Sequence, residues 1–367
     1  MAIEKLHIGR FLELAEKFPV LDVRSPSEFN HAHIPGAINL PLFTDEERRV
    51  VGTTYKQQSR KAAIKIGLDF FGPKMKPMID TVENIVGSFG AAQPPTSNPQ
   101  PPTQVLVHCW RGGMRSAGVA WLMDLYGFKV YTLIGGYKAF RNWAIQQFAI
   151  QHRFNILGGF TGSGKTEVIK ELQRLNEVTI DLEALAGHKG SAFGNIGLPA
   201  QPSQEMFENK LAFALRAAAD SAKESDDKPI WLEDESQRIG TVNIPQPLWL
   251  NMRNSPIYFM DIPFSERLDH IVAEYGSLER EKVFEAIGRL QKRLGGLETK
   301  TAMQYLLQEN VQECFRVLLK YYDKYYQKGL VNRNNLGNLL RTISCSGIQA
   351  ATNATNVLNK TRLISLQ

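Results

Sequence analysis

Short apolar runs alternate with longer stretches of mixed polarity in the first part of the chain. Three runs predict β-strands, because four-residue apolar segments are typical of strands buried in a parallel sheet. They are Val20–Val23, Val105–His108 and Val130–Leu133. Helices are predicted over 10–17, 116–126 and 135–148, and the polar segment Arg24–Glu28 is predicted to be a turn. Strands that alternate with helices favour a parallel sheet, so we predict an α/β domain over residues 1–148.

The same alternation begins again after residue 148. Apolar runs predict strands at Phe154–Leu157, Val178–Asp181, Ile230–Leu232 and Ile257–Asp261, and a helix is predicted over Glu167–Leu175. From about Ser265 onward the pattern is mainly helical. We therefore predict a second α/β domain with a helical C-terminal region over residues 149–331. Residues 332–367 are polar with weak periodicity, and we expect them to form a loosely packed or irregular tail.

Composition narrows the class of protein. A length of 367 residues with 43% hydrophobic and 22% charged residues is typical of a globular protein of two domains. Neither a membrane span nor the apolar core of a signal peptide is expected from the apolar runs. Three widely separated cysteines disfavour a disulfide framework or a four-thiolate zinc site and favour a reducing cytoplasm. The net charge of +6 permits a polyanionic partner without requiring one. Residues 91–103 contain five prolines and no charge, which predicts an exposed extended loop.

Cys109 ends an apolar strand and precedes a loop rich in glycine and arginine. Backbone N–H groups converge in such a loop ahead of a helix, and they stabilise a thiolate or persulfide anion. Positive charge from Arg111 and Arg115 is expected to lower the thiol pKa further from about 8.5. The pattern predicts a cysteine that receives a sulfur-group atom and hands it on; a small residue ending a buried strand is the alternative. The predicted active-site loop holds Trp110, Arg111, Gly112, Gly113, Met114 and Arg115.

The segment GFTGSGKT, residues 159–166, matches G-x-x-x-x-G-K-[ST] between a predicted strand and a predicted helix. That context is typical of a phosphate-binding P-loop, with a lysine that neutralises phosphates and a hydroxyl that can hold Mg²⁺, here Thr166. The predicted phosphate-binding residues are Gly159, Thr161, Gly162, Ser163, Gly164, Lys165 and Thr166. Acids at strand ends are candidates for contact with a metal or the substrate, although solvated strand ends are the alternative. These acids are Asp181, Glu233, Asp234 and Glu235, and their spacing does not decide which one faces the phosphates.

Several segments resemble known families. Leu21–Arg24, Glu28, His33–Asn39 and the strand, loop and helix around Cys109 are similar to a rhodanese domain, in which the loop cysteine carries a persulfide. A rhodanese domain followed by a P-loop domain resembles the tRNA 2-selenouridine synthase family, and the likeness covers about residues 1–330. It includes Pro41–Gly67, His108–Ser116, Leu133–Arg141, Asp181–Gly194, Leu232–Gly240, Lys292–Leu297 and Tyr321–Tyr326.

This resemblance implies a two-stage conversion of the wobble 2-thiouridine in tRNA. A geranyl group from geranyl diphosphate is placed on the sulfur, and selenium from selenophosphate then replaces the S-geranyl group. Cys109 would carry selenium as a selenenylsulfide, and the P-loop would hold a diphosphate. No tightly bound cofactor is expected, Mg²⁺ is an option, and an enzyme that supplies selenophosphate is a candidate partner.

The helical region after Ser265 interleaves basic residues with acids, and its tyrosines offer stacking faces for the unpaired bases of an anticodon loop. Taken alone, such a region is more often a solvated helix face, but the resemblance favours contact with tRNA. Residues expected at the tRNA are His188, Lys189, Arg267, Lys292, Arg293, Tyr321 and Tyr322. Several neutralised phosphates would make this binding weaken steeply with salt.

Two other functions are compatible with the two motifs. A sulfurtransferase fused to a small-molecule kinase would turn over ATP without tRNA. A regulatory module with a redox-sensing Cys109 and a nucleotide switch would form no product over multiple turnovers. The long segments outside both motifs that resemble the family disfavour these alternatives. The sequence does not indicate the tRNA identity, the oligomeric state or the use of sulfur against selenium.

Overall fold

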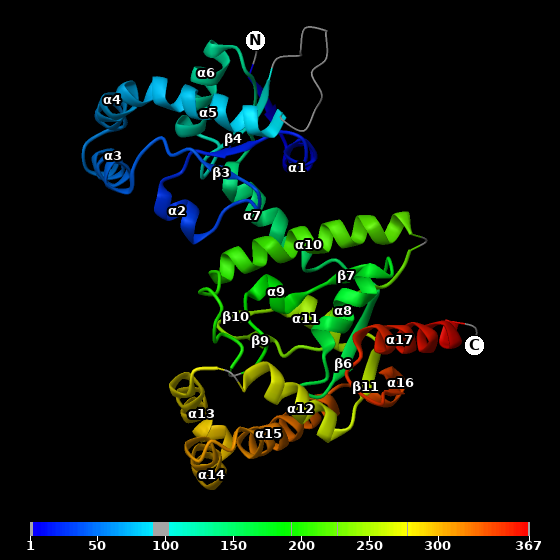
Figure 1. The fold of residues 1–367 in the computed structure, drawn as a ribbon. Helices are drawn as coiled ribbons and strands as arrows, with labels where there is room; N and C mark the ends of the chain where they lie inside the picture. Colours follow the sequence, from blue (N-terminus) through cyan, green and yellow to red (C-terminus); the bar gives the residue numbers. More distant parts are fainter. Residues whose placement is uncertain (1–2, 91–102, 192, 226, 277, 366–367) are drawn as a thin grey trace. The chain divides into compact units, whose positions relative to one another are not determined.

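The computed structural model describes residues 3–90, 103–191, 193–225, 227–276 and 278–365 (Figure 1). The chain divides into two compact units, Met1–Gln146 and Gln147–Gln367, and each is described by itself. The Pro-rich stretch predicted to be an exposed loop lies outside the described residues, apart from Thr103. Among the described helices, none has the length and apolar content needed to cross a membrane.

Unit 1 is built on a five-stranded sheet in the order β1-β5-β4-β2-β3. All neighbouring strands are parallel, which confirms the predicted parallel α/β architecture. The strands are β1 (Glu4–Leu6), β2 (Val20–Asp22), β3 (Ile38–Asn39), β4 (Gln104–His108) and β5 (Lys129–Leu133). Strand β4 lies in the centre of the sheet, and its residues from Val105 onward are buried because both faces are covered.

Helices pack on both faces of this sheet. They are α1 (Ile8–Ala15), α2 (Pro26–His31), α3 (Asp45–Gln57), α4 (Arg60–Phe71), α5 (Met75–Gly90), α6 (Met114–Tyr126) and α7 (Gly136–Gln147), with a 3₁₀ turn at Gly72–Lys74. Residues of α4, α5 and α6 share one core with Val105 and Val107 of β4. On the other face, Phe11 of α1 and Tyr137 of α7 lie beside the buried His108 ring. Helices therefore cover both faces of the sheet, and the carboxyl end of β4, which leads into the Cys109 loop, lies at one edge of that layer.

The prediction of a turn at Arg24–Glu28 is wrong in its second half. Helix α2 begins at Pro26, directly after Ser25. Proline suits the first position of a helix because its missing N–H would be unpaired there. Glu28 lies at the third helical position, and its carboxylate accepts the Ser25 backbone N–H at 3.4 Å. This reciprocal cap starts a helix in a polar segment that has no apolar periodicity.

Unit 2 contains a second five-stranded sheet, in the order β12-β11-β6-β8-β7, with all neighbours parallel. The strands are β6 (Phe154–Gly159), β7 (Thr179–Ile180), β8 (Ile230–Glu233), β11 (Ile257–Asp261) and β12 (Leu340–Ser344). The four predicted strands are present, and β12 is additional. A short antiparallel ribbon, β9 (Arg238–Ile239) and β10 (Val242–Asn243), follows β8.

The helices of unit 2 include the predicted helical C-terminal region. They are α8 (Lys165–Arg174), α9 (Leu182–Ala186), α10 (Gln204–Glu224), α11 (Gln246–Arg253), α12 (Phe264–Tyr275), α13 (Arg280–Leu294), α14 (Gly296–Leu307), α15 (Val311–Val331), α16 (Leu336–Leu339) and α17 (Ala350–Ser365). Helices α12 to α15 bury a core of their own, which includes Leu268, Ile287, Ala302 and Phe315.

In the described part of the predicted tail, residues 332–365 do not form the loosely packed or irregular segment that their polarity predicts. Strand β12 pairs in parallel along the whole of β11, from Leu340 opposite Ile257 onward. The apolar side chains of β12 and α17 join residues of α8, such as Val168, in one core. An edge strand is held largely by backbone hydrogen bonds, so a polar sequence with few apolar positions can complete a sheet.

Candidate functional site

The two predicted chemical sites occupy equivalent places in the two sheets. Cys109 follows β4, which lies between β2 and β5, and Gly159 ends β6, which lies between β8 and β11. In the first sheet the chain forms β2 and β3 on one side of β4 and then, after β4, adds β5 on the other side. In the second sheet it forms β7 and β8 on one side of β6 and then β11 and β12 on the other. Ligands of open parallel sheets bind at such a point, beyond the carboxyl ends of the strands. Topology therefore supports both predicted sites.

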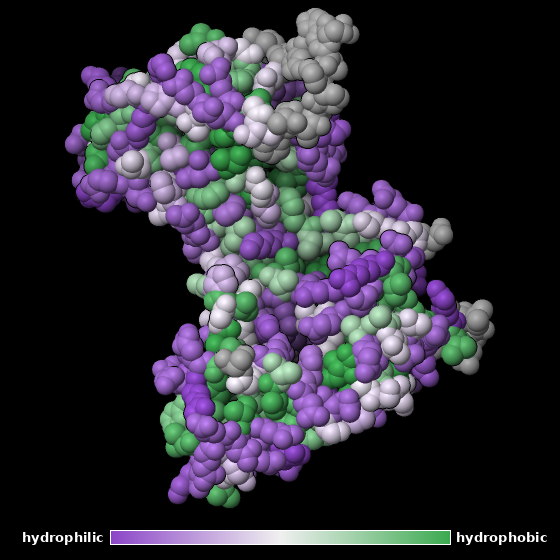
Figure 2. Space-filling model, in the orientation of Figure 1, coloured by the Kyte–Doolittle hydropathy of each residue, from purple (hydrophilic) through white to green (hydrophobic). Residues whose placement is uncertain are grey.

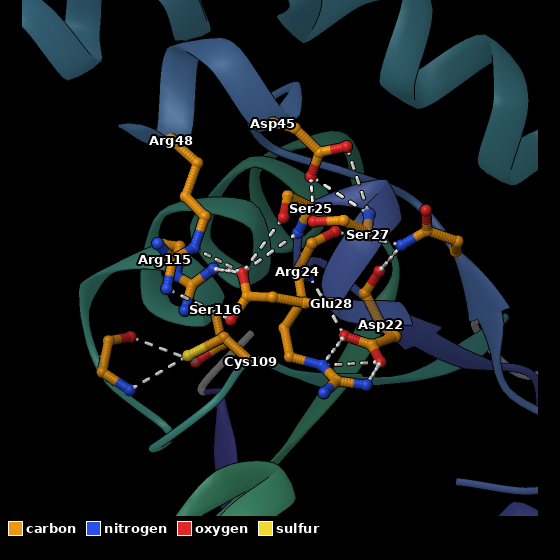
Figure 3. A network of polar contacts seen from close by, with 12 residues as sticks. Asp22, Arg24, Ser25, Ser27, Glu28, Asp45, Arg48, Cys109, Arg115 and Ser116 are labelled. Atoms are coloured by element: carbon orange, nitrogen blue, oxygen red, sulfur yellow. Dashed lines mark hydrogen bonds and ion pairs between the residues drawn. The ribbon is translucent and has the colours of Figure 1, made fainter. Parts of the chain in front are cut away.

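The Cys109 sulfur lies in a ring of hydrogen-bonding groups (Figure 3). Its Sγ is 3.2 Å from Oγ of Ser116 and accepts the backbone N–H of Gly113 at 3.3 Å. The Ser116 hydroxyl also lies 3.0 Å from the Gly113 carbonyl oxygen. Its hydrogen can point to that carbonyl while the sulfur is a thiol and turn to the sulfur once it is a thiolate. The ring is therefore suited to both charge states of Cys109.

Hydrogen bonds make Cys109 the most readily ionised cysteine of the chain. Burial raises the pKa of its thiol, but hydrogen bonds from Ser116 and from the backbone of Arg111 and Gly113 outweigh burial and lower it. Burial raises the pKa of the Cys314 thiol to about 12 and also raises the pKa of Cys345. A thiolate is the reactive form of cysteine, so Cys109 is the thiol equipped for nucleophilic chemistry.

We expect Cys109 to ionise at a lower pH than Cys314 and Cys345, and substitution of Ser116 by alanine to move this ionisation to higher pH. Loss of the hydroxyl removes a hydrogen bond that favours the anion, so the thiol pKa rises. The ultraviolet absorbance of thiolate, followed with pH and corrected by subtracting the Cys109→Ser curve, measures the midpoint. An unchanged midpoint in Ser116→Ala would show that the hydroxyl does not stabilise the anion.

The arginines of the loop do not act as the sequence predicts. Arg115 forms an ion pair with Glu28 at 2.8 Å, and Arg48 binds the same carboxylate at 2.7 Å. Burial raises the pKa of Glu28, but these two arginines hold it at about 2. Arg115 is therefore engaged in an ion pair with Glu28 that it shares with Arg48, and Arg111 contributes its backbone to the sulfur while its side chain is exposed. The Cys109 anion is therefore stabilised mainly by hydrogen bonds and not, as the sequence predicts, by the charge of the two loop arginines.

A buried ion pair between Arg24 and Asp22 lies beside the Cys109 loop and supports it (Figure 3). Nε of Arg24 donates to the two Asp22 carboxylate oxygens at 3.0 and 2.9 Å, and both side chains are buried. The guanidinium of Arg24 stacks 3.9 Å above the centre of the Tyr137 ring, and the Tyr137 backbone N–H donates to the Cys109 carbonyl at 2.8 Å. A Cβ on Gly136 would lie 2.3 Å from that same carbonyl oxygen, so only glycine fits where α7 meets the loop.

Substitution of Asp22 by alanine is expected to destabilise unit 1 by about 3–5 kcal/mol, because it leaves the buried Arg24 without its counter-charge. Hydrogen exchange of peptides from β2 and β4 in the full chain measures the free energy of opening. Glu13→Ala is the matched control, since it removes a carboxylate whose pair with Arg10 is largely exposed. Equal exchange rates in the two variants would contradict a supporting role for the buried pair.

The P-loop has the backbone shape that phosphate binding requires. Gly162 and Gly164 adopt φ values of +80° and +69°, which side chains disfavour. The Lys165 ammonium donates to the Gly159 carbonyl at 3.0 Å. Oγ of Ser163 is buried and has no hydrogen-bond partner among the described residues. The loop thus presents a lysine and an unpaired hydroxyl where a phosphate chain would lie.

The spacing of the four predicted acids does not decide which of them faces the phosphates, but their surroundings in the structure differ. The Thr166 hydroxyl donates to Glu183 at 2.9 Å, and Glu183 was not among the predicted site residues. Glu233 is buried beside this group, and neither of its oxygens has a partner among the described residues. Burial, together with the charges of Glu183 and Asp181, raises the pKa of Glu233 to about 8. Asp181 itself caps α9 through the Ala184 N–H at 2.8 Å.

Asp234 and Glu235 have different surroundings from Glu233. Asp234 accepts a hydrogen bond from the Tyr326 hydroxyl at 2.6 Å and forms an ion pair with Arg333. The Tyr326 oxygen also accepts the Gly159 N–H at 3.2 Å, which ties α15 to the start of the P-loop. Glu235 lies with Glu183 near Gly190, where an added Cβ would meet both carboxylates. Glu233 and Glu183 are therefore the acids nearest the phosphate-binding groups, and Asp234 belongs to the link with α15.

Some residues predicted to contact tRNA form contacts within the protein instead. Arg267 is buried, binds Asp323 with two hydrogen bonds of 2.8 Å and donates to the Thr161 carbonyl at 3.1 Å. Its side chain therefore stabilises the P-loop and does not lie on a surface that RNA could contact. His188 is buried, and Lys189 forms an ion pair with Glu274 at 2.5 Å. Tyr322 packs against the core of α12 to α15. Lys292 and Arg293 are exposed at the end of α13.

The predicted Mg²⁺ contact can be compared with the groups present. Within the described ranges no three His, Cys, Asp or Glu side chains are arranged to hold a metal by themselves. Mg²⁺ commonly takes only one or two protein carboxylates and completes its shell with substrate phosphates and water. The Thr166 hydroxyl with Glu183 and the unpaired oxygens of Glu233 fits that mode of binding.

Comparison with known proteins assigns both units. A profile described as a rhodanese-like domain matches residues 9–142, and one described as the tRNA 2-selenouridine synthase AAA domain matches residues 152–288. The tRNA 2-selenouridine synthase of Bdellovibrio bacteriovorus is 34% identical over 361 residues, which cover 87% of this chain and 90% of that protein. That of Nitrosomonas europaea is 38% identical over 261 residues, covering 70% of this chain and 63% of that protein. That of a Sulfurovum species is 35% identical over 302 residues, covering 77% of each chain. The chain therefore belongs to the tRNA 2-selenouridine synthase family.

Proposed function

We propose that this protein converts 2-thiouridine at the wobble position of tRNA into 2-selenouridine in two stages. One observation carries the proposal: a thiol with a lowered pKa and a phosphate-binding loop each lie at the carboxyl end of a central strand, in a chain of this family. A thiolate site is suited to handling selenium, and a phosphate site to a substrate with a diphosphate leaving group. Neither alternative function suggested by the motifs accounts for the similarity over both units.

In the first stage the sulfur of 2-thiouridine attacks the first carbon of the geranyl group. The new C–S bond forms as the C–O bond to diphosphate breaks, and the thiouracil ring loses its N3 proton to water. Negative charge therefore develops on the departing oxygen. Backbone N–H groups of the P-loop and the Lys165 ammonium are placed to stabilise that charge. To reach a phosphate, Lys165 exchanges its bond with the Gly159 carbonyl for one with the substrate.

Mg²⁺ would supply further positive charge at the diphosphate, held by Thr166 and by Glu183 or Glu233. A cation would also give a partner to the buried Glu233 oxygens, which have no hydrogen-bond partner in the described part of the chain. With a pKa of about 8, this carboxyl holds a proton at neutral pH until a cation displaces it. Binding of Mg²⁺ is therefore expected to release protons, an effect that calorimetry in buffers of different ionisation enthalpy can measure.

In the second stage selenium replaces the S-geranyl group. Alkylation makes the sulfur a good leaving group, and a selenium nucleophile adds to the carbon that bears it as geranylthiolate departs. We propose that Cys109, oxidised beforehand to a mixed disulfide with an external thiol, is attacked by the selenide that forms when water takes the phosphoryl group of selenophosphate. The S–S bond breaks, the external thiol departs, and Cys109 carries selenium as a selenenylsulfide. Release of selenium from that sulfur requires two electrons from an external thiol, which a test reaction must contain.

The proposal is tested with tRNA that contains 2-thiouridine, geranyl diphosphate and a thiol together with its disulfide, with and without selenophosphate. Mass spectrometry of the nucleosides is expected to show S-geranyl-2-thiouridine when selenophosphate is absent and 2-selenouridine when it is present. If the nucleosides remain unchanged and ATP is turned over in the absence of tRNA, the proposal is wrong and the sulfurtransferase–kinase alternative is favoured.

A further inference from the structure

Helix α15 carries a line of lysines on one side. Lys320, Lys324 and Lys328 follow one another at intervals of four residues, so successive lysines lie about 6 Å apart along the axis. All three are exposed, and none forms a salt bridge within the described residues. Like charges at this spacing repel each other on an isolated helix. Their arrangement therefore favours a partner with several negative charges in a row.

A hollow beside these lysines is lined by tyrosines. It has a volume of about 570 Å³ and lies between α15, α14 and the end of α13. Tyr321 and Tyr325 line it with their rings nearly parallel, 6.3 Å apart and inclined by 26°. Tyr325 is 53% exposed, so its ring is accessible from solvent. Arg293 also lines the hollow. Figure 2 shows hydrophilic and apolar residues intermixed over these helices.

A second hollow continues from the first toward the P-loop. It has a volume of about 550 Å³ and is lined by Phe160 of the P-loop and by Val331 at the end of α15. Lys324 and Lys328 line both hollows, so the lysine row runs from the tyrosines to the phosphate-binding loop. The two hollows and the row form one continuous surface, which we call the α15 surface.

We propose that the α15 surface docks the single-stranded loop of the RNA substrate, with bases stacked on Tyr325 and Tyr321 and phosphates along Lys320, Lys324 and Lys328. Aromatic rings beside a basic track are what a single-stranded nucleic acid recognises, because every base has a face to stack and every linkage carries a charge. An acidic protein segment would use the lysines but has no need of the paired rings. This inference rests on the proposed function for the identity of the RNA. Because the second hollow is lined by Phe160, an RNA strand bound along the lysines would reach the P-loop.

The test measures affinity for a fluorescent RNA hairpin with 2-thiouridine in its loop, over a series of salt concentrations. The Lys→Gln variants at 320, 324 and 328 are each expected to reduce the slope of log K against log salt by about 0.7, and the triple variant by about 2. Tyr325→Leu is expected to weaken binding by about 5- to 150-fold with no change of slope, since it removes stacking and no charge. Circular dichroism checks that each variant folds.

Lys300→Gln is the matched control, because Lys300 is exposed on α14 and lines neither hollow. The proposal is overturned if Lys300→Gln changes the slope as much as Lys324→Gln, if Tyr325→Leu binds as wild type does, or if polyglutamate competes as well as RNA. Nucleoside conversion by wild type is measured in parallel. Conversion with unchanged binding by the variants rejects the α15 surface alone, whereas variant-sensitive binding without conversion rejects the proposed function alone.

Discussion

Replacement of Cys109 by serine is expected to stop formation of 2-selenouridine while S-geranyl-2-thiouridine accumulates. A serine hydroxyl does not ionise near neutral pH and cannot form a selenenylsulfide, so selenium has no carrier. Loss of a covalent nucleophile typically lowers turnover by about 10³-fold or more. The P-loop of unit 2 is untouched, so the first stage should continue at the wild-type rate. Mass spectrometry of nucleosides over time measures both species in one reaction.

Cys314→Ala provides the matched control for this experiment. Cys314 is buried in the core of α12 to α15, and the pKa of its thiol is raised to about 12, so it has no role as a thiolate. The variant should form 2-selenouridine as wild type does. If Cys109→Ser still formed 2-selenouridine from selenophosphate at a comparable rate, selenium would reach the base directly and Cys109 would serve another purpose.

Replacement of Lys165 by alanine is expected to slow the geranylation stage by about 10²–10³-fold, because it removes a charge that stabilises the departing diphosphate. The second stage needs no diphosphate. Purified tRNA that already carries S-geranyl-2-thiouridine should therefore be converted to 2-selenouridine by Lys165→Ala at the wild-type rate. Single-turnover measurements on the two substrates separate the stages.

Lys170→Ala tests whether a lost lysine on α8 matters in general. Lys170 is exposed on the same helix, outside the P-loop, so both stages should proceed normally in this variant. A Lys165→Ala enzyme that geranylates at the wild-type rate would mean that the P-loop holds something other than the prenyl donor. A loss of both stages would instead indicate that the loop contributes to binding the tRNA.

The sequence predicts best where the physical cause is local. Both central strands are buried on two faces, so their apolar runs are continuous and easily found. Cys109 and the P-loop follow these strands directly, because the end of a parallel strand is where such a loop is held for ligand binding. A site formed by one contiguous segment can therefore be located without knowledge of the rest of the fold.

Prediction fails where the fold brings distant residues together. Tyr326 bonds to Gly159 across 167 positions of the chain, and no local pattern in α15 indicates that contact. Arg267 illustrates the same limit, since a basic residue on a helix looks exposed in sequence but is buried against Asp323 and the P-loop. The sequence pattern does not single out Glu183, because this residue lies inside α9 rather than at the end of a strand.

Strand β12 has a consequence for the order in which the protein is made. Its partner β11 is synthesised well before it, and all of α12 to α16 intervene. Until residues 340–344 leave the ribosome, the edge of β11 is unpaired, and unpaired edges invite association with other chains. Unit 1 has all its strands by residue 133 and can fold early, whereas the phosphate-binding sheet must wait. Chains released prematurely before β12 would thus carry a finished rhodanese unit joined to an aggregation-prone one.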